Sequence, residues 1–507
     1  MSEAQDAQSD DRVFLALDVG TSGVKVVLAN GKGALLASSY RAYPLVMHAD
    51  GSVEQDLDEI FEALVVAAVE LLAGHPEQVV AGVAVTAQMF NIVAVDEAGV
   101  PLAPMISWLD QRCEGQSEAL QERLPPRLQF ERFGSVLTAK DIVPKILWLA
   151  QNRPELYDRA RWLLDCKEAI VMRLTGNAVT DHAGASAFRL YDPRARAWDI
   201  EACRLVGVDP DKLPPIARAT DVAGTLSPEV TRLIGLPSGI PVYVGAGDVP
   251  ASQLGSGAVR RGEAHLSLGT AAYFGLLLDE PLGDPNGRLG VLAHANPDQS
   301  ILWLETATGG AALAWVLRLV GIDTAGVVDY ERVEQLVDDA EDGMGGLICG
   351  PWLSGERVPV FDDSVRAAFS GLALHHGPGH LIRAVMEGVA FQMRWALEYG
   401  VDYGQEVSKV RVVGGGILGR GWSHIIADIL GHPLELIADP QEAAAVGAAA
   451  CAIVGSGAQP GFDFLADSVT VERTCQPDPS TASTYAQRYE RFTGLYHQLR
   501  PRQAPVT

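Results

Sequence analysis

The first residues that could do chemistry form a glycine-rich turn near the start of the chain. Asp18 is followed by Gly20, Thr21, Ser22 and Gly23, with an apolar run on each side. Glycine lets backbone N–H groups approach an anion closely, and the hydroxyl side chains add further donors. A carboxylate just before such a loop can hold Mg²⁺, directly or through water. The turn is therefore a candidate phosphate and magnesium site, but an ordinary hairpin turn explains it equally well.

A second turn of the same kind lies in the other half of the chain. Leu268 leads into Gly269 and Thr270, again between two apolar runs. Two such turns from opposite halves could hold one polyphosphate from both sides, and the pair is more specific than either turn alone. The shared pattern of strand, Gly-Thr turn and strand indicates duplicated α/β halves, with a boundary near residue 247.

Asp248 is the candidate catalytic base. It follows Gly245, Ala246 and Gly247 at the end of an apolar run, so the backbone can come close to whatever the carboxylate contacts. A carboxylate held beside a phosphoryl donor can take the proton of an attacking hydroxyl. The plainer alternative is an aspartate that caps a turn.

A third glycine-rich segment supports a competing function. Residues 414–419 match the dinucleotide-binding pattern G-x-G-x-x-G, after an apolar run that ends at Val413. Asp439 lies 20 residues beyond Gly419, where a ribose-binding acid is expected. An NAD-dependent oxidoreductase using Gly414 to Gly419 is therefore an alternative. This alternative would leave Asp18 and both Gly-Thr turns without a role. The glycine-rich turn at residues 414–419 can equally admit an adenosine.

Composition restricts the partners. The 507 residues include 39 Lys and Arg against 64 Asp and Glu, a formal net charge of −25. Proteins that bind nucleic acid or anionic membranes usually carry a basic face, so neither partner is expected. No segment predicts a signal peptide or a membrane-spanning helix, and the six cysteines lack CxxC spacing. We expect a cytoplasmic protein with reduced thiols.

Strands alternate with helices along the chain, which predicts α/β sheets covered by helices. Alternating or continuous apolar runs predict strands over residues 13–18, 24–28, 35–39, 79–86, 242–248, 264–268, 271–278, 301–305, 409–413 and 434–437. Helical spacing of apolar residues predicts helices over residues 55–73, 142–149, 168–174, 309–319, 380–399, 422–430, 442–454 and 485–499.

Together with several further motifs, these residues resemble the FGGY family of carbohydrate kinases, within the actin, hexokinase and Hsp70 superfamily. The spacing is most similar to that of xylulokinases. The further motifs are Ser107-Trp108-Leu109-Asp110-Gln111-Arg112, Arg173-Leu174-Thr175-Gly176, Ser354-Gly355-Glu356-Arg357, the segment 381–391 and Ala427-Asp428. The resemblance implies an α/β fold with two actin-like (ribonuclease H-like) ATPase domains flanking a deep cleft. We expect a disordered acidic tail over residues 1–11, a sugar-binding domain over 12–247 and an ATP-binding domain over 248–500.

The resemblance also implies a role for each candidate residue. Asp248 would be the general base for a sugar hydroxyl, and Asp18 and Asp248 would place Mg²⁺. The phosphates of ATP would lie against Gly20, Thr21, Ser22, Gly269 and Thr270. The adenosine would lie against Gly310, Gly414, Gly415 and Gly419. The sugar would lie against Gln88, Met89, Phe90, Asp110 and Asp248.

Two positions depart from the xylulokinase pattern. Phe90 stands where xylulokinases usually have His, and Val249 stands where Asn usually follows the catalytic Asp. Both changes remove a hydrogen-bonding side chain from the expected sugar pocket, and an unpaired buried polar group costs about 1–3 kcal/mol. The predicted substrate is therefore a pentulose such as xylulose, or another small sugar or polyol. Glycerol kinase is disfavoured because its Arg-Glu pair falls at Met89 and Phe90.

Two further matters stay open at this point. A non-catalytic switch that binds ATP and sugar on the same fold is the third alternative, although Asp248 argues against an idle site. Dimers are common in the family, so a homodimer is compatible with the resemblance.

Overall fold

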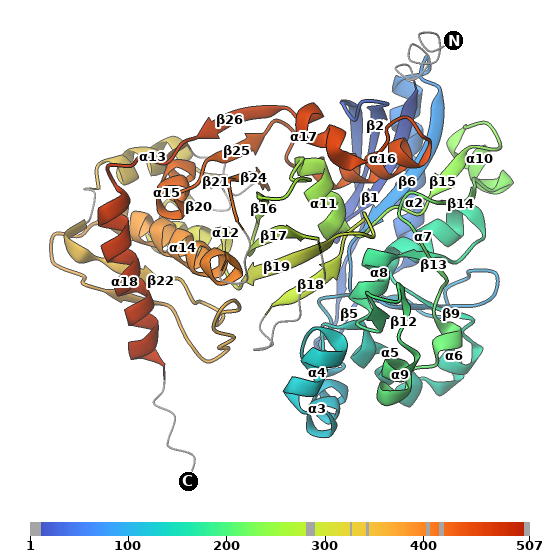
Figure 1. The fold of residues 1–507 in the computed structure, drawn as a ribbon, viewed down its shortest axis with the longest axis horizontal. Helices are drawn as coiled ribbons and strands as arrows, with labels where there is room; N and C mark the ends of the chain where they lie inside the picture. Colours follow the sequence, from blue (N-terminus) through green and yellow to red (C-terminus); the bar gives the residue numbers. More distant parts are fainter. Residues whose placement is uncertain are drawn as a thin grey trace. The chain divides into compact units, whose positions relative to one another are not determined.

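The computed structural model describes residues 12–279, 289–324, 327–340, 344–401, 406–414 and 420–500. The tail predicted over residues 1–11 lies outside them. The chain divides into two compact units (Figure 1). The first comprises Met1–Arg260, Leu277–Ile301 and Glu442–Val469, and the second comprises Arg261–Leu276, Leu302–Gln441 and Thr470–Thr507. Neither unit is continuous in sequence, because the chain returns to the first unit twice.

The first sheet has six strands in the order β14-β15-β6-β1-β2-β3. Strand β1 pairs antiparallel with β2 and parallel with β6. Strand β6 is parallel to β15, which is antiparallel to β14. The bounds are β1 (Val13–Val19), β2 (Gly23–Asn30), β3 (Leu35–Ala42), β6 (Val80–Ala87), β14 (Val222–Thr225) and β15 (Pro241–Tyr243).

The second sheet has seven strands in the order β18-β19-β17-β16-β24-β25-β26. Strand β16 pairs antiparallel with β17 and parallel with β24. Strand β24 is parallel to β25, which is antiparallel to β26. The bounds are β16 (Glu263–Leu268), β17 (Ala272–Leu278), β18 (Gly290–Ala293), β19 (Ser300–Thr306), β24 (Lys409–Val413), β25 (Leu434–Ile437) and β26 (Val471–Cys475).

Six of the seven strands of the second sheet repeat the first sheet strand by strand. The order β3-β2-β1-β6-β15-β14 in the first has the counterpart β19-β17-β16-β24-β25-β26 in the second. In both, an antiparallel hairpin is followed by two parallel strands and an antiparallel edge strand. The predicted duplication is confirmed, and each Gly-Thr turn lies at the same hairpin position of its sheet.

Helices bury both faces of the first sheet. Alternate side chains of β1 enter different cores: Leu15 and Leu17 pack with helix α2 (Leu57–Gly74), and Phe14 and Ala16 pack with helix α16 (Ala443–Gly455). This explains the continuous apolar run of β1, since a strand buried on both faces has no polar side to alternate with. Helix α11 (Asp248–Ser256) packs closely against α16.

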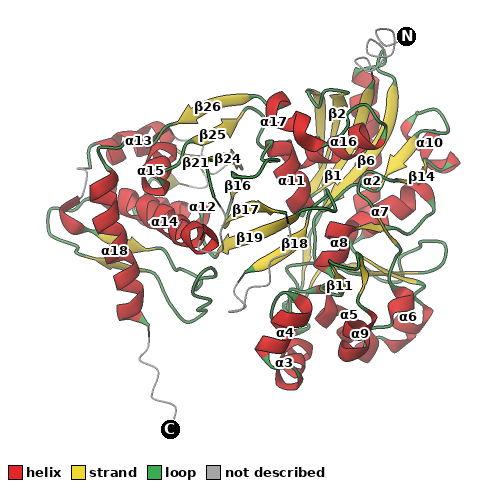
Figure 2. Ribbon diagram, viewed as in Figure 1, coloured by secondary structure: helices red, strands yellow, loops and turns green. Residues whose placement is uncertain are grey.

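Figure 2 shows further helices around each sheet. In the second unit, the long helix α14 (Pro378–Val401) contacts α12 (Gly310–Leu319), α13 (Tyr330–Asp338), α15 (Arg420–Leu430) and α18 (Ala482–Leu499). The first unit also contains α3 (Glu114–Arg123), α4 (Pro126–Phe133), α5 (Ile142–Asn152), α6 (Pro154–Arg159), α7 (Cys166–Thr175), α8 (His182–Ala187), α9 (Ile200–Val206), α10 (Pro228–Ile234) and α17 (Leu465–Ser468).

Short strands complete the described structure. They are β4 (Val46–Met47), β5 (Val53–Gln55), β7 (Val93–Val95), β8 (Met105–Ile106), β9 (Trp162–Leu164), β10 (Thr180–Asp181), β11 (Tyr191–Asp192), β12 (Ala197–Trp198), β13 (Ile216–Ala217), β20 (Asp323–Thr324), β21 (Val327–Val328), β22 (Ile348–Gly350) and β23 (Ala368–Ser370).

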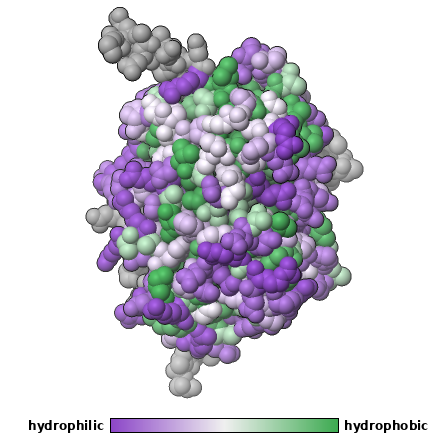
Figure 3. Space-filling model, turned by 90° about the vertical axis from the view of Figure 1, so that its right-hand side faces the viewer, coloured by the Kyte–Doolittle hydropathy of each residue, from purple (hydrophilic) through white to green (hydrophobic). Residues whose placement is uncertain are grey.

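The surface and the cysteines agree with the composition. Apolar residues are scattered among hydrophilic ones on the face drawn in Figure 3. Within the described residues, no helix combines the length and the apolar character needed to cross a membrane. All six cysteines are buried and free of disulfide bonds, as the sequence predicts.

Candidate active site

The turn after Asp18 is held by side chains from outside the hairpin. It lies between the end of β1 and the start of β2, where the Gly20 N–H donates to the Gly23 carbonyl at 3.0 Å. Gln55 Nε2 donates to the Thr21 carbonyl at 2.8 Å, and Trp108 Nε1 donates to Thr21 Oγ1 at 3.0 Å. Because the Thr21 hydroxyl accepts this bond, its own hydrogen is free to donate, as an anion site requires.

Asp18 and Asp248 lie at one edge of the first sheet. Strands β1, β6 and β15 are parallel, so their carboxyl ends meet at this edge, and Asp248 begins helix α11 just after β15. Burial, together with the charges of Asp18 and Asp165, raises the pKa of Asp248 to about 7. Burial also raises the pKa of Asp18 to about 6, although the nearby Lys25 opposes this. A divalent cation would relieve this repulsion, and Mg²⁺ is commonly held by one or two carboxylates plus substrate phosphates.

Two glycines bring Asp248 against strand β6. Gly245 has a φ of 68°, in the left-handed region, and a Cβ there would lie 1.8 Å from the Val85 carbonyl oxygen. A Cβ on Gly247 would lie 2.4 Å from Met89 Sδ. Only glycine fits at residue 245, whereas a larger residue at 247 would require the Met89 side chain to move. The loop that carries Asp248 is therefore packed directly on the end of β6 and the turn that follows it.

That turn contains the predicted sugar-binding residues Gln88, Met89 and Phe90. Gln88 is buried; its backbone N–H donates to the Val19 carbonyl at 2.8 Å, and its Nε2 donates to Gln55 Oε1 at 2.7 Å. Gln88 Oε1 is buried without a hydrogen-bond partner among the described residues. Buried polar atoms are normally paired, so this oxygen is available for a substrate hydroxyl.

A buried aspartate that the sequence analysis did not single out holds this turn. Asp165 accepts hydrogen bonds from the backbone N–H groups of Phe90 at 2.7 Å and Asn91 at 3.0 Å. It also accepts from Asn91 Nδ2 at 3.0 Å, and Asn91 Oδ1 accepts the Trp108 N–H at 3.0 Å. The network thus joins the sugar-binding turn to Trp108, which in turn contacts Thr21. One signal was present in the sequence: an acidic residue directly before an apolar helix is typical of an N-cap.

A buried lysine contributes from the other side of the turn. Lys145 Nζ donates to the carbonyls of Phe90 at 2.6 Å and Lys140 at 2.7 Å. Burial lowers the pKa of Lys145 to about 8. A charged residue inside the apolar helix α5 is a sequence signal of such a role, because an ammonium is buried only with partners.

Asp110 is held by hydrogen bonds and an ion pair within the protein. It is fully buried, and its oxygens accept from the Val53 N–H at 2.6 Å and the Arg112 N–H at 2.8 Å. Arg112 also forms an ion pair with it at 2.8 Å and bridges to Glu54 at 2.8 Å. These contacts tie the segment after Trp108 to strand β5. Direct binding of sugar by Asp110 stays a prediction.

The second unit gathers its own glycines around the other Gly-Thr turn. The N–H groups of Gly309 and Gly310 donate to the carbonyls of Thr270 and Gly269, both at 2.8 Å, and helix α12 begins there. Gly414 follows β24 with a φ of 98°, and a Cβ on it would lie 2.5 Å from the Leu268 carbonyl oxygen. The turn, the start of α12 and the end of β24 therefore meet. Gly415 and Gly419 lie outside the described residues.

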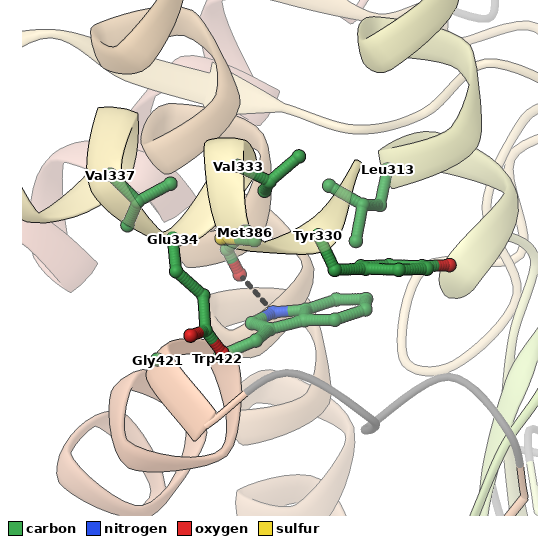
Figure 4. A pocket seen from close by; sticks show the side chains of 8 residues that line it. All are labelled: Leu313, Tyr330, Val333, Glu334, Val337, Met386, Gly421 and Trp422. Atoms are coloured by element: carbon green, nitrogen blue, oxygen red, sulfur yellow. Dashed lines mark hydrogen bonds between the residues drawn. The ribbon is translucent and has the colours of Figure 1, made fainter. Parts of the chain in front are cut away.

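A pocket opens beside this group of glycines. Figure 4 shows the indole of Trp422 facing Tyr330, Val333 and Leu313, with Met386 behind it. Trp422 Nε1 donates to the Met386 carbonyl at 3.2 Å, which fixes the ring. Leu313 lies on α12 one turn after Gly310. The pocket is lined by Leu313, Tyr330, Val333, Glu334, Val337, Met386, Gly421 and Trp422.

The sequence matches two family models that together span most of the chain. The description "FGGY family of carbohydrate kinases" applies to both, with the N-terminal domain over residues 13–255 and the C-terminal domain over residues 264–456. The chain belongs to this family. FGGY kinases use ATP to phosphorylate sugars, so the predicted enzyme class is confirmed. The glycines after β24 are therefore those of a kinase, and the NAD-dependent alternative loses its support.

Named relatives and solved structures resemble this FGGY kinase along nearly its whole length. It is 28% identical to gluconokinase of Bacillus subtilis, with 96% of each chain covered. It is 28% identical to xylulose kinase of Escherichia coli, with 96% of this chain and 99% of the relative covered. The crystal structure of xylulose kinase from Rhodospirillum rubrum matches with a TM-score of 0.89 at 29% identity, covering 96% of this chain and 98% of the other. The predicted α/β fold with two actin-like ATPase domains is confirmed.

Proposed function

We propose that this FGGY kinase transfers the γ-phosphoryl group of ATP to a hydroxyl of a small sugar, with Asp248 as the general base. The observation that carries the proposal is the position of Asp248, on a glycine-bounded loop packed against the Gln88–Phe90 turn. The hydroxyl oxygen bonds to the γ-phosphorus, the bond from that phosphorus to the β–γ bridging oxygen breaks, and ADP leaves. The hydroxyl proton passes to Asp248. A carboxylate whose pKa is raised to about 7 is well matched to that task.

The metal-binding residues in this proposal are Asp18 and Asp248. The two carboxylates are only partly exposed, and the charge of Asp18 raises the pKa of Asp248, so the pair suits a cation. When bound, Mg²⁺ supplies charge neutralisation for the phosphates. Thr21 and the N–H group of Ser22 would orient the phosphates from the first unit.

The second unit would bind the nucleotide. Gly269, Thr270, Gly310 and Gly414 form a small-residue edge that a phosphate chain and a ribose can approach closely. The apolar side chains beside Trp422 would contact the adenine, because flat bases stack on aromatic and aliphatic side chains. The pocket there holds about 20 Å³, so its walls would have to move apart to admit the base. Gly415 and Gly419 stay predicted members of this site.

Several sugars fit the proposal. The relatives are named for xylulose and for gluconate, so a pentulose such as xylulose, a polyol and a sugar acid are all candidates. Phe90 and Val249 supply no hydrogen-bonding side chain, whereas Gln88 Oε1 is buried and unpaired within the described structure. One hydroxyl of the sugar would therefore donate to Gln88.

Substitution of Asp248 tests the proposal. In Asp248→Asn we expect kcat to fall by roughly 10²–10⁴-fold, the usual contribution of general-base catalysis, in an assay of ADP release across pentuloses, polyols and sugar acids. Calorimetry should show ADP binding within about twofold of the unsubstituted protein, because the adenine site lies in the other unit. The matched control is Asp199→Asn, at the N-cap of α9, where asparagine caps equally well.

Two results would count against the proposal. Near-native turnover by Asp248→Asn would remove this carboxylate from the mechanism. If no sugar supports ADP release but ATP and sugar both raise the melting temperature, the non-catalytic switch is the better description.

A further inference from the structure

Two strained residues meet beside the predicted sugar site. Four non-glycine residues of the described structure have left-handed backbones, among them Phe90 with a φ of 67° and Arg189 with a φ of 62°. The guanidinium carbon of Arg189 lies 5.7 Å from the centroid of the Phe90 ring. Such conformations are unfavourable and persist mainly where function requires them. Arg189 therefore lies against the predicted sugar-binding turn at Phe90.

Arg189 is buried and poorly paired. Its side chain is 8% exposed, and its Nε lies 3.5 Å from Asp141 Oδ1 with no hydrogen-bond partner among the described residues. Its Nη1 donates to the Val291 carbonyl at a long 3.4 Å. The other oxygen of Asp141 accepts from both the N–H and the hydroxyl of Thr138. A guanidinium has five N–H donors, and within the described structure Arg189 makes a single hydrogen bond to the protein.

The neighbouring acid does not complete these bonds. Asp165 faces the same turn, but its oxygens already accept four hydrogen bonds, from Phe90, Asn91 and Cys166. Lys145 is likewise committed to the carbonyls of Phe90 and Lys140. Among these groups, Arg189 is the one whose donors are left for a ligand.

We propose that Arg189 is a specificity-determining residue that binds the carboxylate of a sugar acid, so that the acceptor is an aldonate rather than a neutral pentulose or polyol. The proposal rests on the sugar-kinase function proposed above. Guanidinium pairs with carboxylate through two parallel, charge-assisted hydrogen bonds, which neutral sugars cannot offer. Gln88 Oε1, two residues before Phe90, would accept a hydrogen bond from a hydroxyl of the same molecule.

Aldonates and polyols of equal chain length give the sharpest test, because each pair differs only at the carboxylate. The pairs are erythronate with erythritol, xylonate with xylitol, and gluconate with glucitol, and xylulose is added as a neutral pentulose. We expect kcat/KM for one aldonate to exceed that of its polyol and of xylulose by at least about tenfold, the effect of one charged hydrogen bond. Arg189→Gln should lower that value at least about tenfold, while the polyol value and the KM for ATP change less than about threefold.

Arg196→Gln is the matched control. Arg196 also has a left-handed backbone, with a φ of 54°, but its side chain is 43% exposed and pairs with Asp298. This variant should leave every kinetic constant unchanged. Arg189→Lys keeps the positive charge but lacks the paired N–H donors of the guanidinium, so it should retain an intermediate preference for the aldonate. If Arg189→Gln has a strongly lowered melting temperature, Arg189→Lys serves as the test variant in its place.

The outcomes separate this inference from the proposed function. If neutral acceptors are preferred in every pair, or if Arg189→Gln keeps the aldonate preference, the inference is wrong and the kinase function stands. If no acceptor supports ADP release, the kinase function fails. Calorimetry without ATP then decides the inference alone: aldonate binding that Arg189→Gln removes supports it, and absence of aldonate binding overturns it.

Discussion

At the scale of single residues, the candidate site depends on side chains that hold other groups in place. Asp248 and Gln88 were expected from their motifs. Asp165 was not, because only folding brings it close enough to accept hydrogen bonds from Phe90 and Asn91. Sequence shows residue types and spacing. It does not show which buried acid accepts the N–H groups of a turn more than seventy residues away.

Asp165→Asn should misplace the sugar-binding turn. The amide nitrogen cannot accept a hydrogen bond, so it would face either the Phe90 N–H or the Asn91 N–H as a second donor. We expect kcat/KM for the sugar to fall by about 10–100-fold, as for the loss of one or two buried hydrogen bonds to a charged group. The KM for ATP should change little. Steady-state kinetics with both substrates, beside Asp199→Asn, would check this; equal losses for both substrates would indicate general unfolding instead.

At the scale of elements, most of the fold could be predicted. Strand β1 and helices α2 and α14 have apolar runs or helical spacing that their buried faces explain. Helix α3 was missed because only Ser117 and Leu120 are buried in it, so the sequence has no apolar period there. The packing partner of α16 could not be predicted, since a stretch of Ala and Gly is compatible with many neighbours.

The crossing of α11 and α16 leads to a second prediction. A Cβ on Gly447 would lie 1.8 Å from the Ala251 carbonyl oxygen, so Gly447→Ala must push α11 away. We expect a loss of roughly 1–3 kcal/mol in the free energy of unfolding, typical of overpacking. Because α11 begins at Asp248, kcat should fall as well. Denaturant unfolding and ADP release would measure both effects.

Gly494 provides the control for this variant. It lies inside helix α18, and a Cβ there meets nothing within 4 Å. Gly494→Ala should raise the free energy of unfolding by about 0.5–1 kcal/mol, because alanine loses less backbone entropy in a helix. If Gly447→Ala behaves like Gly494→Ala, the close helix crossing is not a constraint.

At the scale of the whole molecule, the strand-by-strand repeat explains the pattern that suggested NAD binding. Gly414 follows β24 as Gln88 follows β6, and Asp439 follows β25 as Asp248 follows β15. Both sheets therefore share the order strand, turn, parallel strand and acid, although 160 residues separate Gln88 from Asp248 and only 25 separate Gly414 from Asp439. Without the sheet order, a single sequence could not distinguish the segment from Gly414 to Asp439 from a dinucleotide-binding unit.

Stability should depend on pH through a buried histidine. Burial lowers the pKa of His294 to about 4, below its usual 6.5, so the unfolded chain takes up a proton first as the pH falls. The contribution of neutral His294 to the free energy of unfolding should be fully present above pH 6.5. It should be lost as the pH falls towards 4, by on the order of 3 kcal/mol. His294→Gln should flatten this dependence in denaturant titrations at several pH values. The exposed His424→Gln is the control, and an unchanged pH slope in His294→Gln would contradict the assignment.

Helix α16 has a consequence for dissecting the protein. It covers Phe14, Ala84 and Tyr243 on one face of the first sheet, yet it is encoded almost two hundred residues after Arg260, where the chain first leaves that unit. A fragment that ends at residue 260 would therefore expose the apolar face of the sheet to water and would tend to aggregate. Anyone splitting the enzyme for expression should co-supply the 442–469 peptide or join it by a linker.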